Sequence, residues 1–141
     1  MSDPVDVATR SRIMSRVRGR NTELERRFRR QLWAAGLRGY RCHRRDIFGV
    51  PDLSWPNLRV AVFIDSAWWH GHPSRWTPGR LPGKWDEKIR GNQARDATVA
   101  EHLADEGWRV VRVWDFEFER DPAEAVMRVA DAVRAARVAR V

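Results

Sequence analysis

An apolar run at residues 60–64 (VAVFI) constrains the fold more than any other stretch, and Asp65 follows it immediately. A short, partly β-branched run of this kind is typical of a strand buried on both faces of a sheet. Such a strand ends at the sheet edge where ligands and catalytic groups of open α/β sheets gather. The sequence therefore predicts a functional site at Asp65 and at the histidine that follows it, His70.

A second acidic residue, Asp52, lies in the segment VPDL at residues 50–53, where another short strand is expected to begin. A Pro-Asn pair at 56–57 supplies a hairpin-type turn between the two strands, so Asp52 and Asp65 are expected side by side. Two carboxylates in one place form a plausible site for a hard divalent cation such as Mg²⁺. The simpler alternative is that Asp52 caps a turn and Asp65 ends a strand.

The remaining pattern predicts an α/β fold with a mixed central sheet flanked by helices. We expect helices over residues 22–35, 85–105 and from 121 onward, and strands near residues 40–42, 51–55, 60–64 and 108–114. A helix that connects two strands, as residues 85–105 do, is typical of a parallel crossover unit. Helical spacing places Trp33 and Met127 on packed helix faces, and Cys42 is expected to be a small core residue.

The charge balance indicates a polyanionic partner. Lys and Arg number 27 against 19 Asp and Glu, which gives a formal net charge of +8, and nearly all the bases are arginine. The arginine fork binds phosphate through two hydrogen bonds, so the bias favours nucleic acid. A genome rich in G and C would produce part of the same bias.

The length of 141 residues suits one domain, expected over residues 21–141 after a flexible basic arm at residues 1–20. One interpretation of the arm is a disordered tail. The other is a segment that becomes ordered along a DNA groove. No apolar run approaches a membrane span, no secretory signal is visible, and the one cysteine fits a reducing compartment, so we expect a cytoplasmic protein.

The predicted helix over residues 85–105 carries an acidic residue on its inward stripe. The stripe, at i, i+4, i+7 and i+11 spacing, consists of Trp85, Ile89, Asn92, Asp96, Val99 and Leu103. A carboxylate facing the interior needs a partner. The sequence leaves two alternatives for Asp96, a histidine of the site or an arginine such as Arg95 or Arg109.

Several short motifs occur together in a characteristic order between residues 10 and 118. They are NTELE at 21–25, GVPD at 49–52, FID at 63–65, WHGH at 69–72, WDEKI at 85–89, Asn92, Arg95-Asp96 and GWRV at 107–110. In this order and spacing the chain resembles the very-short-patch repair (Vsr) endonucleases of the PD-(D/E)xK nuclease superfamily. The resemblance implies a restriction-endonuclease-like fold.

The resemblance also implies a metal-assisted hydrolysis of a phosphodiester bond. Asp52, the backbone carbonyl of Ile64 and Asp65, directly or through water, would hold one or two Mg²⁺ ions. His70 would take the proton from the attacking water, and Asp96 would orient it. Glu25 would reach toward the metal site, although Thr22 and Glu25 also match a helix-capping box.

Further residues are implied to contact DNA. Met14 would wedge between bases, with Arg16, Arg18 and Arg20 along the groove. Trp68, Trp69 and Trp85 would supply stacking surfaces near the target base pair, the alternative being that Trp69 and Trp85 belong to the core. The remaining candidates for phosphate or base contact are Arg75, Trp76, Lys88 and Asn92.

The chain departs from the resembled pattern at two points. Position 67 is alanine, where the superfamily usually has a lysine, which fits a histidine-dependent site. The cysteines of a structural zinc site are replaced by Ala67, Ser74 and Phe116, and only His72 is kept. A structural zinc is therefore not expected, and Trp76 is expected to hold the loop by packing.

The leading prediction is a Mg²⁺-dependent endonuclease that nicks one strand of double-stranded DNA at or near a T:G mismatch. One alternative is a restriction or defence nickase without mismatch dependence, and another is a catalytically weak module that binds distorted duplexes. Action on one strand predicts a monomer. The resemblance further implies repair-pathway proteins as partners and a nucleoid-associated location in a bacterial cell.

Overall fold

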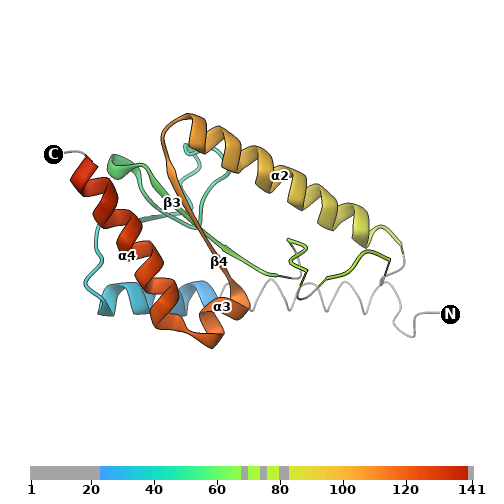
Figure 1. Cartoon of the computed structure of the whole chain (residues 1–141), viewed down its shortest axis with the longest axis horizontal. Coiled ribbons are helices and arrows are strands. Elements are labelled where there is room, and N and C mark those ends of the chain that lie inside the picture. Colours follow the sequence, from blue (N-terminus) through green and yellow to red (C-terminus); the bar gives the residue numbers. More distant parts are fainter. Residues whose placement is uncertain (1–22, 68–69, 74–75, 80–82, 140–141) are drawn as a thin grey trace.

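The computed structural model describes residues 23–67, 70–73, 76–79 and 83–139. Residues 23–34 are helical, and four strands follow with their intervening helices (Figure 1). In chain order the elements are β1 (Arg41–Cys42), β2 (Leu53–Trp55), the 3-10 helix η1 (Pro56–Leu58), β3 (Val60–Asp65), α2 (Trp85–Asp105), β4 (Arg109–Trp114), α3 (Asp115–Arg120) and α4 (Pro122–Ala139). The α/β prediction is confirmed.

The four strands form one mixed sheet in the order β1-β2-β3-β4. Strands β1, β2 and β3 are antiparallel neighbours, whereas β3 and β4 are parallel and are connected through α2, as the crossover prediction required. The predicted register of the two acids is wrong. Leu53 pairs with Val62, so Asp52 precedes β2, while Asp65 pairs with Trp114 of β4.

Each face of the sheet is covered by helices, with α2 on one face and α4 with the 23–34 helix on the other (Figure 1). Leu53, Val60 and Val62 face the core shared with Phe28 and Val129. On the face under α2, Ala61 and Phe63 pack against Ile47, Val99 and Leu103. Burial of β3 on both faces explains its unbroken apolar sequence.

Three packing predictions are wrong. Trp33 is 57% exposed and Met127 is 61% exposed, because both lie just outside the buried stripes of their helices. Cys42 is exposed, since β1 is a two-residue edge strand whose side chains both face solvent. The short helix α3 was not predicted. Within the described residues, no helix combines the length and apolar character needed to cross a bilayer.

Candidate active site

The turn that follows β3 brings His70 back over the end of the sheet. The His70 N–H donates to the Ser66 carbonyl at 3.1 Å, and the His72 N–H donates to the Ala67 carbonyl at 2.7 Å. Gly71 has φ +71, and an added Cβ there would lie 2.3 Å from Gln93 Nε2. Only glycine fits this close contact with α2, so the WHGH motif has a structural reason for its glycine.

His70 meets Asp96 of α2 in a short hydrogen bond. His70 Nδ1 lies 2.6 Å from Asp96 Oδ2, and His70 Nε2 lies 3.5 Å from Asp65 Oδ1. Arg112 of β4 joins both carboxylates, with its Nη1 2.9 Å from Asp65 Oδ2 and 3.2 Å from Asp96 Oδ2. We call these four residues the His70 cluster. The predicted contact between His70 and Asp96 is confirmed.

The surroundings of the His70 cluster shift the pKa of two of its groups. Burial raises the pKa of Asp65, and His70 and Arg112 oppose that rise. For His70, burial favours the neutral ring, but the hydrogen bond to Asp96 and the charges of Asp65 and Asp96 outweigh it and raise the pKa above 6.5. His70 is therefore more basic than a free imidazole.

A second group of side chains surrounds Asp52. Glu25 Oε1 lies 2.6 Å from His43 Nε2 and accepts a hydrogen bond from Arg29 Nη1 at 2.8 Å, and His43 Nδ1 lies 3.9 Å from Asp52 Oδ1. We call Glu25, His43 and Asp52 the Asp52 cluster. The N–H of Ile64 donates to Asp52 Oδ2 at 2.7 Å, which connects this cluster to the end of β3.

Among the described residues, the one ion-pair partner of Asp52 is His43, at 3.9 Å. Burial is the main cause that raises the pKa of Asp52 to about 6, and the nearby charges of Glu25 and Asp65 add to the rise. Each of the two clusters places carboxylate and imidazole ligand atoms within 4.8 Å of one another, as a divalent metal requires. The donor atoms around Asp52 therefore fit a cation, which would stabilise the charged carboxylate.

Two functional candidates escaped sequence reasoning. Arg112 was read only as part of a strand, yet the parallel register that pairs it with Phe63 brings it between two acids. His43 was not among the predicted site residues, yet its Nε2 lies 2.6 Å from Glu25 Oε1. Alternation along β4 is the signal that would have placed Arg112 on the face of α2.

The predicted DNA contacts fall into two groups. Those that lie outside the described residues are Met14, Arg16, Arg18, Arg20, Trp68, Trp69 and Arg75. Of the others, Trp76 is only 9% exposed and donates its indole N–H to Asp86, so it packs the loop and offers little surface to DNA. Trp85 is half-buried, and the Lys88 ammonium lies 4.6 Å from the centre of the Trp85 ring. Asn92 is also half-buried, one helical turn from Asp96.

Aromatic packing surrounds the one residue kept from the resembled zinc motif. The ring of His72 lies edge-on to Trp114 and to Phe116, with centroids 4.9 Å apart in both pairs. Phe116 occupies a position where the resemblance implies a cysteine. Asp115 beside it accepts the N–H of Ala67 at 3.1 Å, which ties the turn after β3 to α3.

An acidic and histidine-bearing site at the end of a mixed sheet, in a basic chain, fits a nuclease of the α/β class. The profile of the family described as DNA mismatch endonuclease Vsr matches residues 2–76. The nicking enzyme V.XorIIP of Xanthomonas oryzae is 40% identical over 83% of this chain and 87% of that protein.

Two further relatives agree with that result. The nicking enzyme V.HpaIIP of Haemophilus parainfluenzae is 34% identical over 82% of this chain and 84% of its own length. The DNA mismatch endonuclease Vsr of Escherichia coli is 33% identical over 82% of this chain and 74% of its own length. The chain belongs to the Vsr family and is a DNA endonuclease.

Proposed function

We propose that this endonuclease nicks one strand of duplex DNA at or near a T:G mismatch, with Mg²⁺ as its metal. The observation that carries the catalytic part of the proposal is the placement of two groups at the end of β3: a buried carboxylate, Asp52, bonded to the Ile64 N–H, and a histidine, His70, held by Asp96. The name of the Escherichia coli relative, a DNA mismatch endonuclease, supports the mismatch, and the names of the other relatives support nicking.

We assign the metal to the Asp52 cluster. Asp52 would be the principal ligand, with Glu25 and His43 beside it, and the Ile64 carbonyl would complete the set of protein donors. When bound, Mg²⁺ would polarise the scissile phosphate and stabilise the charge that develops on the leaving oxygen. Asp65 is already paired with Arg112 at 2.9 Å. We therefore propose a smaller role for Asp65 in metal binding than the sequence predicts.

We assign proton transfer to the His70 cluster. If Nδ1 carries the hydrogen that Asp96 accepts, Nε2 presents its lone pair and can take a proton from the attacking water. Asp96 holds the ring and stabilises the imidazolium that forms. Arg112 keeps both carboxylates in place and limits the negative charge around the ring.

The experiment is strand-resolved cleavage of end-labelled duplexes, one T:G mismatched and one fully paired, with Mg²⁺ or EDTA. We expect a nick in the thymine strand of the mismatched duplex only, abolished by EDTA and by Asp52→Ala. Equal nicking of the paired duplex would replace the mismatch proposal with a restriction-type nickase, which the type II nicking names of several relatives favour.

A third result would overturn the catalytic assignment itself. Tight binding of the mismatched duplex without a cut, with Mg²⁺ or Mn²⁺, would leave a binding module. Wild-type protein at a concentration well above that of the duplex should be used, so that weak binding cannot be mistaken for absent catalysis.

A further inference from the structure

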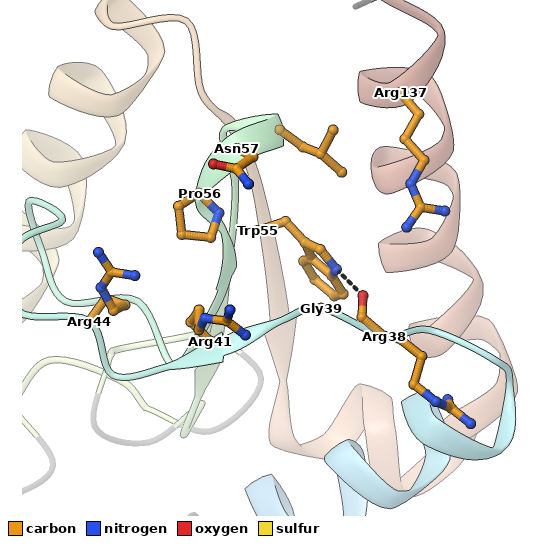
Figure 2. Close-up of a pocket in the computed structure, with 9 residues that line it drawn as sticks. Arg38, Gly39, Arg41, Arg44, Trp55, Pro56, Asn57 and Arg137 are labelled. Atoms are coloured by element: carbon orange, nitrogen blue, oxygen red, sulfur yellow. Dashed lines mark hydrogen bonds between the residues drawn. The ribbon is translucent and has the colours of Figure 1, made fainter.

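A basic pocket of about 420 Å³ lies near the beginning of β3, whereas the active site lies at its end. Its walls are the turn from Trp55 through η1, the segment that leads into β1, and the last turns of α4 (Figure 2). Figure 2 shows Arg137 reaching from α4 on one side of Trp55, with Arg41 and Arg44 on the other side. Four arginines and no carboxylate are among the lining residues.

The four arginines are not equivalent. Arg44 is paired with Asp46 through a 2.7 Å hydrogen bond from Nε, and Arg38 stacks over the Trp33 ring at 3.4 Å and donates to the Trp33 carbonyl. Over the ranges that the structure describes, Arg41 and Arg137 have no ion pair. Two exposed cations thus flank one pocket without counter-charge, which favours an anionic ligand.

The pocket is connected to the active site through the edge of the sheet. Arg41 of β1 is two residues from His43, whose N–H donates to the Asp52 carbonyl at 3.2 Å. Because β1 is the outer strand of the described sheet, this edge can lie against a partner. A long anion that starts at Asp52 can therefore continue along the edge strand to Arg41.

We propose that Arg41 and Arg137 bind a backbone phosphate of the same duplex that the active site cuts, outside the site of cleavage; this proposal rests on the proposed function. Arg41 pairs with Ser54, two residues from Asp52, so its backbone lies about 7 Å along the sheet from Asp52, whereas the beginning of β3 lies about 17 Å (five steps) from Asp65, at roughly 3.3 Å per residue. Since each strand of B-DNA carries a phosphate every 3.4 Å or so along the axis, that phosphate lies about two to five base pairs from the cut.

The first test is the salt dependence of duplex binding, measured in EDTA so that no strand is cut. The variant is the double replacement Arg41→Gln with Arg137→Gln. The matched control is Arg134→Gln, which removes an exposed arginine of the same helix that pairs with Asp131 at 3.2 Å and lies outside the pocket. A plot of log Kd against log salt should become shallower by about one to two for the double variant and stay unchanged for the control.

The second test locates the phosphate. Single neutral methylphosphonates are placed at successive positions of the substrate, and one about two to five base pairs from the cut should weaken wild-type binding but leave the double variant unaffected. An unchanged salt slope in the double variant overturns the proposal. So does tight binding of inorganic phosphate or a mononucleotide with no change in duplex affinity, because the pocket would then serve a small anion.

The two proposals fail in distinguishable ways. Both pocket tests measure binding in EDTA, so they are informative even if no duplex is nicked. If the wild type nicks DNA and the double variant keeps the wild-type slope of log Kd against log salt, the proposed function stands. The pocket would then have no part in DNA binding.

Discussion

The Asp52 cluster and the His70 cluster each contain two carboxylates and one imidazole, but they differ in how charge is balanced. In the His70 cluster, one guanidinium contacts both carboxylates within 3.2 Å. In the Asp52 cluster, Arg29 pairs with Glu25, and Asp52 has only His43, at 3.9 Å. A balanced cluster can hold an imidazole in a fixed orientation, whereas an unbalanced one attracts a metal ion. Identical ligand chemistry therefore supports two different roles.

The largest effect is expected for Asp52→Asn. Cleavage should fall to background, because the proposed metal site loses its principal ligand. The variant should also be more stable than the wild type at pH 7.5, by about 1–3 kcal/mol, since no charge is then buried at this position.

The sign follows from the pKa of Asp52, which is raised from 3.8 to about 6 on folding. Between these values the folded state binds more protons than the unfolded state, so wild-type stability falls as the pH rises through this window. Thermal unfolding with and without Mg²⁺ checks both points, because the cation should stabilise the wild type and not Asp52→Asn. Residual cleavage, or a Tm below that of the wild type, would contradict the assignment.

The next largest effect is expected for His70→Gln, which removes the proton acceptor. The single-turnover nicking rate should fall by about 10²–10³-fold, in the range typical of a lost general base. His102→Gln is the control, because His102 is an exposed histidine of α2 that pairs with Glu106. A rate within a few-fold of the wild type would mean that His70 does not accept the proton.

A smaller effect is expected for Asp96→Asn, which keeps the shape of the side chain and removes its charge. The rate should fall by about 10–100-fold, as is common when a group that orients a catalytic ligand is changed. Because the bond to Asp96 raises the pKa of His70, its loss should move the acidic limb of the pH–rate profile to lower pH. An acidic limb that stays in place would show that another group titrates.

The smallest effect is expected for His43→Gln. If His43 supports the metal and does not transfer the proton, about tenfold more Mg²⁺ should be needed for half-maximal nicking, with a nearly normal rate at saturation. Rates measured across a Mg²⁺ titration separate these quantities. If the nicking rate of His43→Gln at saturating Mg²⁺ is as low as that of His70→Gln, the two clusters do not have separate roles in metal binding and proton transfer.

Much of the candidate site was predictable because local patterns carry it. The buried strand β3, the helix bounds Trp85–Asp105 and the inward position of Asp96 follow from periodicity. Periodicity did not decide whether His70 or an arginine is the partner of Asp96. In the structure both contact it, and the arginine is Arg112, neither Arg95 nor Arg109.

By itself, the sequence determined the α/β class, the family and the residue types at the end of β3. Only the tertiary structure decided how the acids divide between two clusters, because that division depends on strand register. Leu53 pairs with Val62, so Asp52 lies ahead of β2, beside Glu25 and His43. The parallel pairing of β3 with β4 brings Arg112 within 2.9 Å of Asp65. Periodicity along one chain specifies which face a residue occupies, but it does not specify which residue of another strand lies opposite.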